Sequence, residues 1–182
     1  MEILRIVLAS VSVLAIVLCV STIKLQEKKV LSNLGECKVK FLRKKNKLLI
    51  PVIIFSVLII ALQFLRSFPF YIAVVLDLVA ILACFIAIKD FIYQKNAGLY
   101  LNGLISDGRF IKKSDILALP TLDYEESEEF RSQKDNDEYS SQAYETAMKS
   151  LKIVSDSHGE FYVGFSTAEE RKNAVEIMRT WV

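Results

Sequence analysis

The stretch Leu48–Ile88 reads LLIPVIIFSVLIIALQFLRSFPFYIAVVLDLVAILACFIAI, and it decides the character of the chain. Arg66 and Ser67 divide it into two apolar runs, residues 48–65 and 68–88. A helix rises about 1.5 Å per residue, so roughly 20 mostly apolar residues cross the core of a bilayer. We therefore predict two membrane-spanning helices joined by a short link.

A third apolar run, from Ile3 to Ile23, precedes these two. A buried core helix is the alternative for any one run, but three runs in the first half of the chain favour a membrane. A signal peptide carries its positive charge before the apolar core, whereas Lys24, Lys28 and Lys29 follow this run. We therefore predict a three-helix transmembrane region over residues 1–89, with helices at about 3–23, 48–65 and 68–88.

The loop between the first two runs, residues 24–47, is strongly basic and reads KLQEKKVLSNLGECKVKFLRKKNK. The link after the second run holds only Arg66. Positive residues stay in the cytoplasm because their translocation is disfavoured and anionic lipid head groups attract them. We therefore expect a multi-pass protein of the cell membrane with its N-terminus outside and its C-terminal domain in the cytoplasm.

The basic loop has two interpretations. In the first it lies on anionic lipid, and its apolar residues let part of it form an interfacial helix. In the second it docks an acidic partner or a particular lipid head group. Nucleic acid is not expected as a partner, since membrane topology explains the charge. The residues expected to face lipid are Lys28, Lys29, Lys38, Lys40, Arg43, Lys44, Lys45 and Lys47.

Asp77 is an acidic residue near the middle of the third run. A carboxylate at that depth costs about 2.5–3.5 kcal/mol on insertion scales, so it usually faces a bundle interior or a partner. Counting from the outer helix ends puts Ser56 at a similar depth, with Ser10 or Ser12 on the first helix. The alternatives are a structural contact between helices, a salt bridge to another subunit and a proton-linked site.

After about residue 90 the pattern changes to short apolar runs broken by Asn102-Gly103 and Asp107-Gly108. These dipeptides are strong hairpin signals because both turn residues must accept a positive φ. We predict an antiparallel meander with strands at about 98–101, 104–106, 109–111 and 115–119, ended by Pro120.

An acidic stretch at about 123–146 follows. From Asp123 to Glu138 it has eight acidic and two basic residues, too polar to form a core, so we predict a flexible insertion or an acidic interaction arm.

Two further strands are predicted around Ser157-His158-Gly159, with Phe161, Val163 and Phe165 on the core face. A capping box, either Ser166 with Glu169 or Thr167 with Glu170, then begins a C-terminal helix. The apolar stripe of that helix consists of Ala174, Ile177, Met178 and Trp181. The predicted fold class is α+β, with a small antiparallel sheet or partial barrel closed by this helix.

The order of these elements, opening with GLYLNGLISDGRFIKKSDI, resembles the bacterial pleckstrin-homology-like (PH-like) domains found behind membrane helices. The resemblance covers residues 90–182, roughly the last half of the chain. It implies a non-catalytic binding or assembly module and no particular ligand.

The sequence lacks the phosphate-binding, zinc-protease and nucleophile-elbow motifs of common enzymes. With one histidine and three scattered cysteines, we expect no metal, no cofactor and no catalysis. The favoured function is a membrane-anchored scaffold or adaptor that binds a protein partner or copies of itself. The alternatives are an accessory subunit of a transporter or of an envelope-stress or antimicrobial-immunity system, and a small channel or transporter.

Overall fold

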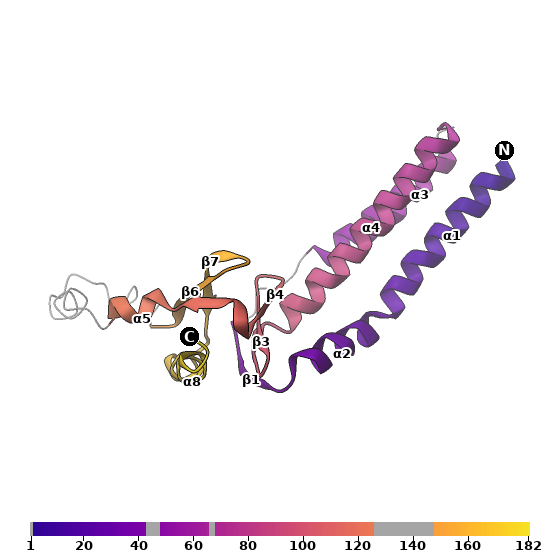
Figure 1. Ribbon diagram of the computed structural model, residues 1–182. Helices are drawn as coiled ribbons and strands as arrows, with labels where there is room; N and C mark the ends of the chain where they lie inside the picture. The colour runs from indigo at the N-terminus through magenta and orange to yellow at the C-terminus, as the bar shows by residue number, and fades with distance from the viewer. Residues whose placement is uncertain (1, 43–47, 66–67, 126–147) are drawn as a thin grey trace. The chain divides into compact units, whose positions relative to one another are not determined.

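The computed structural model describes residues 2–42, 48–65, 68–125 and 148–182 (Figure 1). It combines α-helices with antiparallel sheets, which confirms the α+β class. The chain forms two compact units, Met1–Val30 with Lys45–Lys95, and Leu31–Lys44 with Asn96–Val182. This division differs from the predicted boundary after residue 89, because a piece of the basic loop belongs to the second unit.

The first unit is helical and holds α1 (Glu2–Ser21), the start of α2 (Ile23–Leu34), α3 (Leu49–Leu65) and α4 (Phe70–Lys95). α3 and α4 form an antiparallel hairpin, and α1 packs along α4 (Figure 1). Near its end α4 forms an ion pair between Lys95 and Glu27 of α2 at 2.7 Å. The bounds of α1, α3 and α4 agree with the predicted runs to within about two residues, except that α4 continues past Ile88 to Lys95.

Among the described helices, α4 alone is long and apolar enough to cross a membrane, and only 28% of its most apolar stretch is buried. Ile6–Ser21 and Ile23–Leu34 would add a second span if taken together, but they are bent by 46°. α3 has only 17 residues, with Leu49–Gln63 as its apolar part. By length and composition the three predicted spans therefore reduce to one or two.

The second unit contains two antiparallel sheets and a C-terminal helix (Figure 1). A short helix, α5 (Pro120–Glu125), follows the fifth strand, and α8 (Ala168–Arg179) ends the unit. The first sheet has the order β1-β2-β3-β4 and the second β5-β6-β7. The strands are β1 (Cys37–Lys40), β2 (Gly98–Tyr100), β3 (Gly103–Ser106), β4 (Arg109–Lys112), β5 (Ile116–Ala118), β6 (Ser150–Ser155) and β7 (Gly159–Gly164), with a 3-10 turn, η1 (Lys113–Asp115), before β5.

The basic loop is not a simple loop. Part of it forms α2, and Cys37–Lys40 forms the edge strand β1, which pairs with β2. Beyond β1 the N–H of Leu42 donates to the carbonyl of Gly164 at 2.7 Å, so the segment joins the two sheets. β1 was missed because its partner strand comes some sixty residues later, after two helices.

The two predicted hairpin turns differ in structure. Asp107 and Gly108 both have positive φ, 47° and 74°, as predicted. At the other turn the prediction was wrong for Asn102, which has no positive φ. Tyr100 pairs with Gly103, so the turn residues are Leu101 and Asn102 rather than Asn102 and Gly103.

The core of the second unit lies between its sheets and α8. Val163 and Phe165 are buried and Phe161 packs against them, as the alternation predicted. Thr167 and Glu170 form the capping box, and the predicted stripe of α8 packs on the core. Pro120 begins a helix as well as ending a strand region. Most of the predicted acidic insertion, from 126 onward, lies outside the described residues.

Candidate functional site

The polar site of the first unit is built around Asp77. This residue on α4 is only 2% exposed. The hydroxyl of Ser12 on α1 donates to its Oδ2 at 2.7 Å. The side-chain amide of Gln63 on α3 donates to its Oδ1 at 2.5 Å. Both carboxylate oxygens therefore accept a hydrogen bond, and one carboxylate joins all three helices.

The sequence of α1 explains how Ser12 reaches Asp77. Its inward-facing residues are spaced alternately three and four apart, the spacing of a helix–helix seam. Small residues let helices approach closely, and Ala9, Ala73 and Ala80 are all nearly inaccessible. The seam consists of Ala9, Ser12, Ile16 and Cys19 on α1 and continues to Ile23 at the start of α2.

Ser56, the first candidate partner, does not bond to Asp77. Its hydroxyl donates to the carbonyl of Ala80 at 3.2 Å. Helical side chains lean toward the N-terminus of their own helix. Asp77 on α4 therefore leans toward the α3–α4 turn, whereas side chains on α3 lean away from it. Ser56 consequently meets α4 about one turn too far along, and Gln63, which lies nearer the turn, meets the carboxylate.

Of the two candidate serines on α1, one bonds to Asp77 and the other does not. Ser12 contacts Asp77, while Ser10 is exposed and donates to the carbonyl of Ile6 within its own helix. Sequence reasoning missed Gln63. The signal was present, because Gln63 is the only amide side chain in the run 48–65 and its long side chain reaches across a turn.

The geometry of this cluster favours a contact that fixes the three helices. Its two donors bond to the two oxygens of one carboxylate, and such hydrogen bonds join neighbouring helices. Among the described residues no group of three or more His, Cys, Asp or Glu side chains is arranged to hold a metal ion.

The predicted lipid-facing residues fall in different parts of the chain. Lys28 and Lys29 are exposed on α2 in the first unit, beside the exposed Leu25. Lys38 and Lys40 lie on the exposed face of β1 in the second unit. Arg43, Lys44, Lys45 and Lys47 lie outside the described residues.

One of these lysines has an acidic neighbour. Lys38 pairs with Glu36 at 2.6 Å, and this hydrogen bond holds the pKa of the Glu36 carboxyl below its ordinary value. Lys38 is therefore partly neutralised within β1, which weakens its case as a lipid contact.

Comparison with known proteins leaves the family open. No protein-family model, no curated protein and no solved structure matches this chain.

Proposed function

We propose that the chain is a multi-pass membrane protein whose second unit is a non-catalytic PH-like module. In this proposal the helical unit of α1, α3 and α4 lies in the cell membrane, with α4, the helix that is long and apolar enough by itself, as its principal span. The module acts in the cytoplasm as a scaffold or adaptor that assembles proteins beneath the bilayer.

The observation that carries the membrane part is the outward face of the helices. The first unit hides a narrow seam and exposes large apolar side chains over the rest of α1, α3 and α4. A helix bundle in water presents polar residues outward, and large exposed apolar patches mark contact with a membrane or a partner. The exposed side chains include Val11, Leu14, Ile54, Phe55, Leu58, Leu78, Leu82 and Phe85.

The ends of the helices support the same proposal. Tyr71 is 69% exposed near the start of α4, and Lys89 lies over the ring of Tyr93 at 5.8 Å near its end. Aromatic and basic residues favour the two interfaces of a bilayer. The 17 residues of α3 are at the short end of the range that spans a bilayer core.

The exposed Lys28 and Lys29 beside Leu25 fit an anionic lipid surface. Their charge supports the orientation with the N-terminus outside, since basic segments stay in the cytoplasm.

The order of strands supports the scaffold part. The support is the order of strands β2 to β7 followed by the capped helix α8, while β1 lies outside the residues that the resemblance covers. The hairpin α3–α4 is inserted between β1 and β2, so the chain enters and leaves the membrane region from within the module. The chain therefore passes between the helical unit and the module three times, after residues 30, 44 and 95.

Membrane fractionation and cysteine labelling test the proposal. The chain should resist extraction with alkaline carbonate and dissolve only in detergent. In intact cells an impermeant maleimide should label Ser67→Cys and spare Ser157→Cys, with lysed cells as the control for reactivity. Release of the chain from the membrane by alkaline carbonate would refute membrane insertion. Labelling of the cysteine at position 157 in intact cells would refute the orientation.

The scaffold role has its own test. Gentle detergent extraction followed by native mass measurement should find the chain in a complex with itself or another protein. An isolated chain that carries ions or solutes in proteoliposomes would instead favour the channel or transporter alternative.

A further inference from the structure

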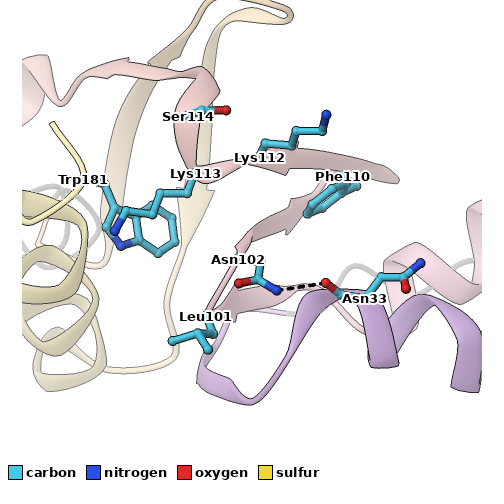
Figure 2. Close-up of a pocket in the computed structure, with 8 residues that line it drawn as sticks. All are labelled: Asn33, Leu101, Asn102, Phe110, Lys112, Lys113, Ser114 and Trp181. Carbon is cyan, nitrogen blue, oxygen red and sulfur yellow. Dashed lines mark hydrogen bonds between the residues drawn. The ribbon is translucent and has the colours of Figure 1, made fainter.

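A pocket of about 560 Å³ opens on the second unit (Figure 2). It lies between the β2–β3 turn, the end of β4 with η1, and the end of α8. Pockets of this size hold small ligands or a few residues of a peptide.

The pocket has apolar walls that face solvent. Leu101 at the β2–β3 turn is 59% exposed, and the rings of Phe110 and Trp181 are half-buried. Figure 2 shows Trp181 and Phe110 on opposite sides of the opening. Exposed aromatic and aliphatic side chains in a recess are typical anchors for an apolar side chain of a partner.

The pocket is also cationic. Lys112 and Lys113 line it, and none of the described residues that line it is acidic. The ammonium of Lys113 lies 5.6 Å from the ring centroid of Trp181, so the charge stands directly beside an apolar wall. Among the described residues neither lysine forms an ion pair with a carboxylate. As far as the described residues go, both ammonium charges are therefore available to a ligand.

The base of the pocket is held in place by Asn102. Its N–H donates to the carbonyl of Leu34, and its own carbonyl accepts from the N–H of Lys113, both at 3.2 Å. Its side-chain amide donates to the carbonyl of Asn33 at 3.0 Å (Figure 2). These bonds tie the end of α2, the β2–β3 turn and η1 together. A binding surface that is ordered in advance loses less entropy when a partner binds.

From these observations we propose that the pocket docks an acidic peptide segment of a partner protein, with one apolar side chain seated among Leu101, Phe110 and Trp181. Carboxylates beside that anchor meet Lys112 and Lys113. This assignment rests on the proposed role of the second unit as a protein-binding module, and it names the class of partner.

The lining favours a peptide over a phosphate or a lipid head group. Phosphate sites typically use arginine forks or converging backbone amides, and the part of the chain that the structure describes puts no arginine in this pocket. A head group or a free phosphate would also leave the walls of Leu101, Phe110 and Trp181 without an apolar partner. An acidic peptide with one apolar anchor fits both the charge and the walls.

Trp181 supplies the reporter, because it is the only tryptophan in the chain. The full chain in detergent micelles is screened against an array of short Trp-free peptides, each with a central Leu, Ile, Met or Phe flanked by Asp and Glu. The best peptides are then titrated while Trp181 emission is recorded. Matched peptides with Asn and Gln, inorganic phosphate, and vesicles containing phosphatidylglycerol are titrated in parallel.

The expected result is a saturable change in Trp181 emission with acidic peptides, at least tenfold weaker binding of their amide counterparts, and no competition by phosphate or vesicles. In a fluorescein-peptide anisotropy assay, Lys112→Glu combined with Lys113→Glu should weaken binding at least tenfold. Lys172→Glu, a single charge reversal at an exposed position of α8 outside the pocket, should leave peptide binding unchanged.

Three outcomes would overturn the proposal: no acidic peptide binding better than its amide counterpart, equal binding by the charge-reversed variant, or displacement by phosphate or vesicles. None of these touches the membrane part of the proposed function, which carbonate extraction tests separately. Conversely, if the chain binds the peptides but is released by carbonate, the peptide-binding proposal stands and the proposal of membrane insertion fails.

Discussion

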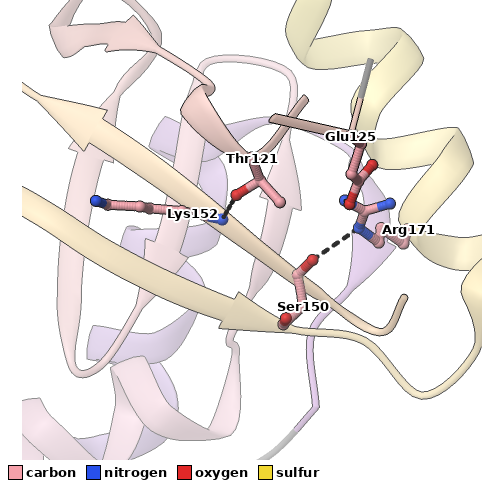
Figure 3. A network of polar contacts seen from close by, with 5 residues as sticks. All are labelled: Thr121, Glu125, Ser150, Lys152 and Arg171. Atoms are coloured by element: carbon pink, nitrogen blue, oxygen red, sulfur yellow. Dashed lines mark hydrogen bonds and ion pairs between the residues drawn. The ribbon is translucent and has the colours of Figure 1, made fainter. Parts of the chain in front are cut away.

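Replacing Arg171 with methionine should destabilise the second unit far more than a charged residue on an amphipathic helix would suggest. Arg171 lies on α8, but it is only 5% exposed. Its Nε donates to the carbonyl of Ser150 at 2.7 Å, and its guanidinium pairs with Glu125 at the end of α5 (Figure 3). One side chain thus ties α8 to the start of β6 and to α5.

The size of the effect follows from the burial of this pair. Removing one partner of a buried ion pair costs about 3–5 kcal/mol, because the other charge stays buried without compensation. The side chain of Glu125 keeps 18% of its surface exposed, so it can turn partly toward water. We therefore expect a loss of about 3 kcal/mol, at the lower end of that range. Glu125→Gln keeps an acceptor for the guanidinium and should lose less.

Hydrogen exchange of the full chain in detergent, read by mass spectrometry, measures this loss locally. A loss of about 3 kcal/mol raises the open population of β6 and α8 by a factor of roughly 100. The control is Lys152→Met, which breaks the pair of Lys152 with Glu160 at the surface of the same sheet. That variant should exchange almost like wild type. Equal protection in Arg171→Met and Lys152→Met would refute the argument from burial.

Three further predictions follow. Asp77→Leu should lower the stability of the helix bundle by about 1 kcal/mol in detergent titrations while Asp77→Asn stays near wild type; an unchanged Leu variant would exclude a role in helix contact. Burial raises the pKa of the Cys37 thiol, so at pH 7.5 maleimide should label Cys37 more slowly than Ser157→Cys. Raising the pH past 9 forms more Cys37 thiolate and should reduce the difference between the two labelling rates. Equal labelling rates at pH 7.5 would contradict this prediction. Gly103→Ala should disrupt the β3–β4 pairing, because its Cβ would lie 2.3 Å from the carbonyl oxygen of Ile111; unchanged hydrogen exchange in β3 would contradict it.

Local patterns in the sequence were sufficient for the elements that depend on near neighbours. The apolar runs gave α1, α3 and α4, and Asp107-Gly108 gave a hairpin turn with positive φ. Thr167 with Glu170 gave the start of α8. These signals act within a few residues, so no tertiary contact is needed to read them.

Other features depend on which segments meet in three dimensions. Val39 pairs with Leu99 across two intervening helices, and nothing local marks Cys37–Lys40 as an edge strand of that sheet. Gln63, rather than Ser56, reaches Asp77 because the two helices run antiparallel and their side chains lean toward each other.

Arg171 shows the same limit most clearly. By sequence it is an ordinary charged residue in the first half of an amphipathic helix, and it is buried only because Glu125 and the carbonyl of Ser150 lie beside it. The sequence by itself therefore determined the long helices, one hairpin turn, the start of α8 and the apolar character of the first half. The tertiary structure decided the partners, because a buried polar group is tolerated only where distant parts of the chain supply its hydrogen bonds.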